Sequence, residues 1–584
     1  MHRPRSFFSF RFTQVSDKFP DRKQKEKLRS SPDVIRYPAV IMRNHSPDAG
    51  ASGSAGKPGK GDGRVMVEKL KKEVWGSKLG IILAVAGSAV GLGNFLRFPV
   101  QAANNGGGAF MIPYFISLLL IGIPLMWIEW AIGRYGGVHG HTTAPGMFNR
   151  LWNNRLGKYF GVIGVFGPLV IFIYYLYIES WLLGYSVYSL AGVLTDVPDK
   201  ESMAKFLSAY QGLETNTYFH SFIPAYLFFI VTIGLNYFVI FRGVTKGIER
   251  LCKFAMPMLF LAAFVLLIRV VTLDAPYPDK PDWNILNGFG YLWNPDFSAL
   301  LNAKTWLAAA GQVFFTMSVG IGVILTYASY LRRGDDIALS GLTAASTNEF
   351  AEVILGGSII IPLAFAFFGP EGMKEVAASG AFNLGFVTMP FIFSKISLGA
   401  LFSFLWFFLL FLAGLTSSIS LIEPAVAFIR DDFQIERKKA ATIVGIVAFV
   451  LCQPAIFFLG HGVVDELDFW GGTFCLVLFG TIESILFAWT FGIDRAWQEI
   501  HHGAQLNIPR VYKWIIKYVT PVLLLVILGT WIVQQGWSTM VMANVKPDDV
   551  PYVLCTRLGL LVLFLILAML VHIWHKKVFQ GEGK

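Results

Sequence analysis

The sequence predicts an all-α membrane protein that crosses the bilayer about twelve times. Of its 584 residues, 54% are hydrophobic and 15% are charged, and the mean hydropathy is +0.55. A soluble chain of this length would be considerably more polar. Apolar stretches long enough to span a bilayer recur along the chain, and none shows the two-residue alternation that is typical of a transmembrane β-barrel.

The predicted spans follow a polar N-terminal segment and continue almost to the C-terminus. Each is an apolar stretch of about 20 residues, the length of helix that crosses the hydrocarbon core. Their centres lie near Val85, Leu119, Ile171, Phe229, Phe260, Phe315, Val353, Phe408, Val447, Leu476, Leu525 and Phe564. We therefore expect a polytopic bundle rather than a domain with a single membrane anchor.

Residues 1–65 differ in composition from everything after them. This segment is polar and basic, ends in Gly, Ser and Lys repeats between Ala49 and Arg64, and lacks the apolar core of a secretory signal. We expect it to be a disordered extension. Because Met66 is a plausible first residue, an over-extended reading frame explains the segment about as well as a genuine tail does.

The distribution of basic residues predicts the orientation. Lysine and arginine gather in the N-terminal segment, after the second, fourth and sixth spans, and at the C-terminus, whereas the loops 195–199 and 546–549 carry acids. By the positive-inside rule both termini lie in the cytoplasm, as expected for a multi-pass protein of the plasma (inner) membrane. The net charge of +11 reflects this bias and the basic residues of segment 1–65, so nucleic acid is not an expected partner.

Two predicted spans are interrupted by nearly the same glycine-bearing tetrapeptide. The first span contains residues 90–93, Val-Gly-Leu-Gly, and the sixth contains residues 319–322, Val-Gly-Ile-Gly. In lipid an unpaired amide costs several kcal/mol, and each glycine within a helix costs about 1 kcal/mol relative to alanine. Paired breaks therefore indicate exposed main chain with a function, which most often is to hold an ion or a small polar solute.

Further motifs accompany the breaks and relate the chain to a known family. They are the run from Ala86 to Pro99 and residues 104–110, 127–130, 174–181 and 414–418. On these motifs the chain resembles the neurotransmitter:sodium symporters, close to their prokaryotic leucine-transporter members, over nearly all of residues 68–575. The resemblance implies two inverted repeats, 66–272 and 273–490, with discontinuous helices 1 and 6. Helices 11 and 12 and a cytoplasmic tail follow in 491–584.

The resemblance also implies two sodium sites. A sodium ion in a dry cavity needs about half a dozen oxygen ligands, and uncoiled helix frees main-chain carbonyls. By similarity the first ion is held by Ala89, Asn94, Thr316 and Asn348 together with the substrate carboxylate. The second is held by Gly87, Val90, Ala413, Thr416 and Ser417. Alternatively, the hydroxyls bond back to their own helix and the amides are ordinary packing contacts between spans.

For the substrate, the resemblance implies an amino acid whose carboxylate meets exposed helix-end amides. By similarity its binding residues are Ala89, Leu92, Gly93, Ile171, Tyr175, Phe315, Thr316, Ser318, Ile321, Ser417 and Leu421. None of these residues is acidic, which disfavours a cationic side chain and predicts a neutral, aliphatic amino acid. The alternative, that they are ordinary core residues, fits the apolar stripe but explains Tyr175 poorly.

Two gates are implied by the same resemblance. An outer gate pairs Arg97 with Asp468, above a lid of Phe315 and Tyr175. An inner gate uses Lys72, Asp431 and Tyr330. The family normally has arginine where this chain has Lys72, and lysine cannot form the two-pronged contact with a carboxylate, so we expect a looser inner gate. The alternative for Arg97 and Lys72 is that each extends to the membrane interface.

Glu352 stands where animal members of the family usually have a small hydroxyl residue beside a chloride ion. By similarity it lies among Tyr114, Gln312, Thr316 and Asn348, and it shares a helix face with Asn348, four residues earlier. A fixed carboxylate there would replace chloride, so we expect chloride-independent transport with Glu352 protonated as the empty carrier returns. Glu129, Glu179, Glu349 and Glu483 are interpreted as structural. Glu423 replaces a typical glutamine, and the sequence offers no account of it.

These patterns favour a sodium-driven symporter that imports a neutral amino acid by alternating access. The ten histidines, including the pairs His139 with His141 and His501 with His502, form no catalytic or metal pattern, so an enzyme is not expected. The four cysteines lack metal spacing. A sensor or channel of the same fold remains the alternative. The expected partners are the amino acid, sodium ions and lipid, and the sequence leaves a homodimer open.

Overall fold

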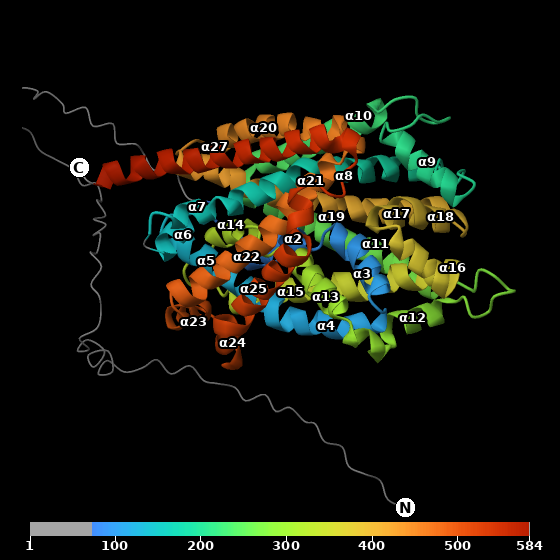
Figure 1. Cartoon of the computed structure of the whole chain (residues 1–584), viewed down its shortest axis with the longest axis horizontal. Coiled ribbons are helices and arrows are strands. Elements are labelled where there is room, and N and C mark those ends of the chain that lie inside the picture. The colour runs from blue at the N-terminus through green and yellow to red at the C-terminus, as the bar shows by residue number, and fades with distance from the viewer. Residues whose placement is uncertain (1–72, 153, 583–584) are drawn as a thin grey trace, which may run out of the picture. The chain divides into compact units, whose positions relative to one another are not determined.

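The computed structural model describes residues 73–152 and 154–582, and these residues are almost entirely helical (Figure 1). Within them the only β pairing is an isolated bridge between Gly107 and Pro295. In the first half of the chain the α-helices are α2 Lys78–Ala89, α3 Phe98–Asn104, α4 Met111–Ser117, α5 Ile123–Val138, α6 Ala144–Leu151, α7 Gly157–Gly161, α8 Ile163–Leu190, α9 Lys200–Tyr210, α10 Ile223–Phe241, α11 Arg250–Val271 and α12 Ile285–Trp293.

The second half is built in the same way. Its α-helices are α13 Ala303–Thr316, α14 Val323–Ser329, α15 Ala338–Glu349, α16 Ser358–Ala378, α17 Ala381–Asn383, α18 Met389–Ser394, α19 Gly399–Ala427, α20 Arg437–Phe457, α21 Val463–Leu467, α22 Cys475–Ile485, α23 Ile493–His501, α24 Val511–Trp514, α25 Thr520–Trp531, α26 Trp537–Met540 and α27 Val550–Glu582. Short π-helical and 3₁₀ segments join several of them into longer helices, so the elements outnumber the spans.

Ten continuous helices in the described residues are long and apolar enough to cross a membrane. They are Gly108–Val138, Gly157–Leu190, Ile223–Phe241, Val244–Val271, Ala338–Ala378, Gly399–Asp432, Arg437–Phe457, Val463–Thr490, Val511–Gln534 and Pro547–His575. An eleventh crossing is the bent pair Lys78–Ala89 and Gly93–Asn104, whose axes differ by 45°. The predicted sixth span corresponds to α13 and α14. Every predicted span centre thus lies within a helix.

The helices divide into an inner group and an outer group. Helices α8 and α19 pack along one another, as Figure 1 shows, and both are predominantly apolar without a distinct polar face. The most apolar window of Gly157–Leu190 is 94% buried, whereas that of Pro547–His575 is 17% buried. Exposed leucines such as Leu558 and Leu561 on α27 suit a lipid-facing helix. The inner helices therefore shield the broken pair from lipid.

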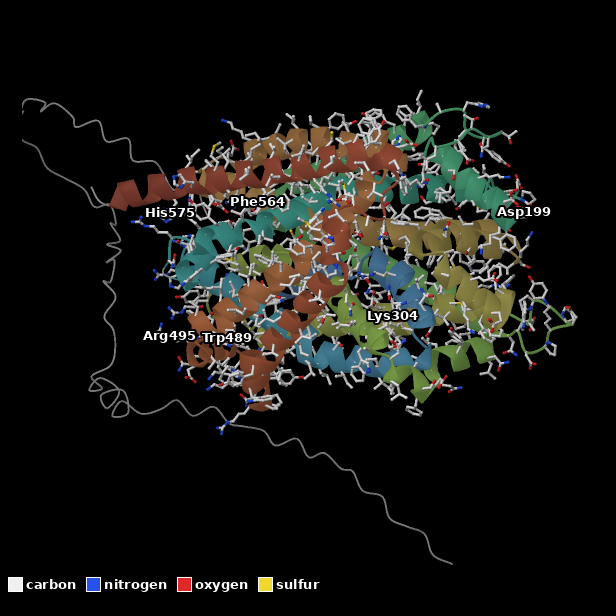
Figure 2. All side chains as sticks on the ribbon, in the orientation of Figure 1. Asp199, Lys304, Trp489, Arg495, Phe564 and His575 are labelled. Atoms are coloured by element: carbon white, nitrogen blue, oxygen red, sulfur yellow. The ribbon has the colours of Figure 1, made fainter. Side chains whose placement is uncertain are left out.

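Opposite ends of the bundle carry the loops that the charge pattern separates. In Figure 1, α9 and α12 lie at one end and α6, α7 and α23 at the other. Figure 2 places Asp199 at the first end, and Arg495 and His575 at the second. The division into two inverted repeats stays a prediction. The predicted extension 1–65 and Lys72 lie outside the described residues.

Candidate functional site

At the first break, two backbone amides donate to side chains instead of to the carbonyls of the preceding helical turn. Helix α2 ends at Ala89, and Val90 leaves the helical conformation with φ −72° and ψ 87°. Gly91 N donates to Asn94 Oδ1 at 2.8 Å, and Leu92 N donates to the Tyr175 hydroxyl at 3.5 Å. In a continuous helix these two amides would bond to the carbonyls of Gly87 and Ser88. The break thus frees both carbonyls for other donors.

The second break uses backbone conformations that favour glycine. Helix α13 ends at Thr316 and α14 begins at Val323. Between them Ser318, Gly320 and Gly322 have φ values of 52°, 77° and 81°, and for a non-glycine residue such as Ser318 this conformation is strained. The amide of Gly320 donates to the buried carboxylate of Glu129, which fixes the uncoiled segment against α5.

Side chains join the two breaks directly. The Ser318 hydroxyl donates to the Ser88 carbonyl at 2.9 Å. From α19, the Ser417 hydroxyl reaches the same carbonyl at 3.2 Å and that of Gly87 at 3.4 Å. Three segments far apart in the sequence therefore meet at the uncoiled end of α2, with hydroxyl and carbonyl oxygens gathered between them.

The residues predicted for the first sodium ion form one hydrogen-bonded group. Asn94 Nδ2 donates to Asn348 Oδ1 at 2.8 Å, and Asn348 Nδ2 donates to Thr316 Oγ1 at 3.1 Å. All three side chains are buried, and Ala89, the last residue of α2, lines one cavity together with Asn94 and Thr316. Uncharged oxygens in a dry setting suit an alkali-metal ion carried as cargo, so the donor set fits sodium. Their role as ligands stays a prediction.

The residues predicted for the second ion also lie together, with one difference. Glycine at position 87 permits close approach, since an added Cβ would lie 3.2 Å from Cβ of Thr416. The Thr416 hydroxyl, however, donates to the carbonyls of Leu412 and Ala413 at 3.1 and 3.2 Å, which is the bonding back to its own helix that the alternative describes. Ser417 instead bonds across to α2. Val90 begins the adjoining break.

One cavity between the two breaks is lined by every residue predicted to bind substrate. Its walls include Ala89, Leu92, Gly93, Ile171, Tyr175, Phe315, Thr316, Ser318, Ile321, Ser417 and Leu421. No acidic or basic side chain is among the lining residues, all of which the structure describes. The polar part of the wall consists of main-chain groups, hydroxyls and the Asn94 amide, which suits a zwitterion without a charged side chain.

Five further lining residues fall outside the predicted substrate-binding and sodium-binding sets. They are Ser88, Gly91, Tyr174, Ser420 and Leu476. The hydroxyls of Ser88 and Ser420 lie 2.7 Å apart and join α2 to α19. Ser420 falls three residues after Ser417, and this spacing on one helix face is a signal that could have identified it. Leu476 comes from α22, and nothing in its sequence neighbourhood indicates the contact.

A second cavity of about 360 Å³ shares Phe315 and Tyr175 as walls with the first. Arg97 and Asp468 both line it, as the outer gate predicts. Their partners differ from the predicted ones: the Arg97 guanidinium lies 4.3 Å from the Phe315 ring centre, and Asp468 accepts from the Tyr174 hydroxyl at 2.5 Å. No ion pair within 4.0 Å joins Arg97 to Asp468 among the described residues. Direct pairing of these two side chains stays a prediction.

The two described residues of the predicted inner gate bond to different partners, although Glu73 lies within 3.8 Å of Arg430 and 3.2 Å of Arg437 and so links the two groups. Asp431 accepts from Thr142 at 2.7 Å and lies 3.4 Å from Arg430. Tyr330 instead donates to Glu423 Oε1 at 2.7 Å. The two predicted gate residues are therefore not bonded to one another, and Lys72 lies outside the described residues.

Glu423, which the sequence left unexplained, is the partner of a buried arginine. Nη1 and Nη2 of Arg437 contact its two carboxylate oxygens at 2.6 and 2.7 Å. Arg437 also lies 3.2 Å from Glu73, before α2, and donates to the Ile240 carbonyl at the end of α10. Burial raises the pKa of Glu73 above its ordinary value, although the charge of Arg437 opposes the shift. Five segments meet at this cluster.

Glu352 is fully buried and occupies the setting that the resemblance implies. Its Oε1 accepts from Gln312 Nε2 at 2.5 Å, and its Oε2 accepts from the Tyr114 hydroxyl at 2.8 Å. Tyr114 also contacts Glu349 at 2.7 Å. The carboxylate thus sits between two donors, next to the Asn348 and Thr316 group. Whether it replaces a chloride ion stays a prediction.

Comparison with known proteins decides the family. The model of the Sodium:neurotransmitter symporter family matches residues 72–202 and 203–577. The chain belongs to this family. Its members are transporters rather than enzymes. Relatives from both an archaeon and an animal are named as sodium-dependent transporters.

Similar proteins include a sodium-dependent transporter of Methanocaldococcus jannaschii that has no established function, with 30% identity over 78% of this chain and 89% of that protein. The sodium-dependent nutrient amino acid transporter 1 of Drosophila melanogaster is 26% identical over 78% of this chain and 76% of its own length. Among solved structures, MhsT in complex with L-phenylalanine matches with a TM-score of 0.66 and 30% identity, over 78% of this chain and 99% of MhsT.

Proposed function

We propose that this symporter imports a neutral, aliphatic amino acid with sodium by alternating access. The observation that carries the proposal is the cavity between the two breaks, because its lining combines hydroxyl and main-chain groups with branched apolar side chains and no charged side chain. The names of the relatives support an amino acid as substrate: one is a nutrient amino acid transporter, and MhsT was solved with L-phenylalanine. Ile171, Ile321, Leu421 and Leu476 shape the pocket for an aliphatic group.

Two sodium ions would couple the substrate to the membrane gradient. The substrate carboxylate would complete the ligand shell of the first sodium ion, beside Ala89, Asn94, Thr316 and Asn348. The substrate and this ion would therefore each bind weakly without the other. Each ion moving down a roughly tenfold gradient and about 100 mV releases about 1.4 plus 2.3 kcal/mol, and two ions concentrate a zwitterion roughly 10⁵-fold. The orientation proposed is that of a plasma-membrane protein with cytoplasmic termini, and transport is proposed to need no chloride.

The test is uptake into proteoliposomes containing the purified full-length chain. We expect an aliphatic amino acid, identified from a panel, to accumulate above its external concentration when sodium is outside, and to stop accumulating when potassium replaces sodium. An Asn348→Ala variant should need a higher sodium concentration, because a ligand of the first ion is removed. Sodium-dependent binding without accumulation would favour the sensor or channel alternative and contradict the symporter.

The pocket wall formed by Leu421 is expected to set the size limit of the substrate. Leu421→Ala should raise the uptake of phenylalanine relative to leucine by about tenfold, because one small hydrophobic change in a pocket is worth about 1–3 kcal/mol. Leu415→Ala provides a matched control, since Leu415 is a similarly buried leucine of α19 that does not line the cavity. An unchanged ratio of the two uptakes in Leu421→Ala would show that this wall does not limit the substrate.

A further inference from the structure

A basic pocket lies outside the transport site, at the end of α11. This cavity of about 430 Å³ is formed by the last turn of α11 and the loop after it, by α16, and by the segment that follows α18. Its lining residues are Arg269, Leu273, Pro276, Tyr277, Phe367, Lys395, Ile396 and Ser397. The two charged residues of the lining, Arg269 and Lys395, are therefore both cations, although they are more than a hundred residues apart in the sequence.

Neither cation has a carboxylate partner within 4 Å among the described residues. Arg269 lies 5.8 Å from the ring centre of Phe402. Lys395 Nζ donates to the Pro198 carbonyl at 3.1 Å and lies 5.1 Å from the Phe391 ring centre. Neutral partners leave both positive charges uncompensated, and two like charges that line one cavity repel one another. An anion between them would remove this repulsion.

The surroundings of the pocket indicate where the anion comes from. Arg269 lies in the last turn of the membrane span Val244–Val271, where a span meets the headgroup layer. Apolar side chains flank the pocket on both sides and are largely exposed: Ile268 (63%) and Val271 (57%) on α11, and Leu398 (69%) and Leu401 (44%) at the start of α19. In a membrane these side chains would contact acyl chains. Tyr277 suits the interface as well.

We propose that this pocket binds the phosphate group of an anionic phospholipid. A guanidinium donates two parallel hydrogen bonds to phosphate oxygens, and an ammonium adds a mobile point charge, so Arg269 and Lys395 supply complementary contacts. Two cations favour a headgroup with a net negative charge over a zwitterionic one. The bound lipid would join α11, α16 and the segment before α19, none of whose pocket residues lines the substrate cavity. The inference rests on the membrane-spanning fold and not on the proposed substrate.

Native mass spectrometry of the delipidated full-length protein in detergent tests this site, with phosphatidylglycerol as the probe. The double variant Arg269→Gln/Lys395→Gln should bind phosphatidylglycerol at least about a hundredfold more weakly, because it loses two charge-assisted hydrogen bonds to the phosphate. The control is Lys280→Gln: this lysine is exposed in the loop after α11, lies 3.9 Å from the Trp283 ring centre, and does not line the pocket. Its binding should equal that of the wild type.

Three results would overturn the proposal. One is equal binding of phosphatidylglycerol by the double variant and the wild type. Another is wild-type binding of phosphatidylcholine that matches phosphatidylglycerol. The third is displacement of phosphatidylglycerol by inorganic phosphate at a similar concentration, which would make the ligand a soluble anion. Should the double variant fold poorly, the single variant Lys395→Gln replaces an exposed side chain and is expected to weaken binding measurably by itself.

Discussion

Replacing Glu352 by serine is expected to make transport depend on chloride. In the wild type the carboxylate accepts from Gln312 and Tyr114, and it is fully buried. Serine is too short to reach both donors, and a buried donor without a partner costs about 1–3 kcal/mol. The negative charge that would balance the sodium ions is removed as well. A chloride ion between the two donors would restore both the hydrogen bonds and the charge.

The measurement is sodium-driven uptake into proteoliposomes in chloride or in gluconate. In gluconate we expect the uptake by Glu352→Ser to be about ten- to a hundredfold lower than that of the wild type, because one or two buried donors lose their partner. In chloride the variant should regain most of this uptake. The wild type should transport equally well in both. Glu349→Gln is the matched control, because Glu349 contacts the same tyrosine hydroxyl from one turn earlier. If Glu352→Ser behaves identically in the two anions, the carboxylate does not substitute for chloride.

The broken helices could be predicted because their cause is local. Glycines at 91 and 93, and at 320 and 322, interrupt otherwise apolar stretches, and the structure ends α2 and α13 close to them. The complete set of predicted substrate residues lines one cavity for a related reason. These residues lie in or beside the two breaks and the motifs that carry the family resemblance, so identifying the breaks and the motifs located the cavity.

Two short helices in the loops were missed although their start signals are readable. Helix α9 begins after Asp199, whose side chain accepts from the amide of Ser202. Helix α12 begins after Asn284, which caps the amide of Asn287 in the same way. Aspartate and asparagine are common at the residue before a helix. A search for apolar stretches of about 20 residues overlooks such elements because they are short.

Partners between distant charged groups could not be predicted. Asp468 bonds to Tyr174, and Arg97 lies against the Phe315 ring. Both contacts depend on how α8, α13 and the segment after α21 pack together. Arg437 is the first residue of α20, at the start of the ninth predicted span, where a basic residue is expected from topology alone. Its contact with Glu423 needed the structure, since a topological charge and a buried ion pair have the same sequence signature.

The buried contact between Arg437 and Glu423 leads to a graded prediction. Arg437→Met leaves Glu423, which is 0% exposed, with the Tyr330 hydroxyl as its remaining partner. Removing one member of a buried ion pair costs about 3–5 kcal/mol, so this variant should be strongly destabilised. Glu423→Gln should cost less, because Arg437 keeps Glu73 at 3.2 Å and the Ile240 carbonyl. The double variant should recover much of the loss.

The free energy of unfolding in detergent, together with hydrogen exchange of residues 78–89, measures this series. The exposed Lys439→Met is the control, because it removes a neighbouring cation that has no partner in the cluster. Faster exchange in α2 is expected for Arg437→Met, since Glu73 precedes that helix and loses its arginine contact. If the double variant is as unstable as Arg437→Met, the loss arises from the packing of the guanidinium rather than from an unpaired carboxylate. The cluster would then hold the segments by shape, and Glu423 would have no electrostatic role in closing this end of the transporter.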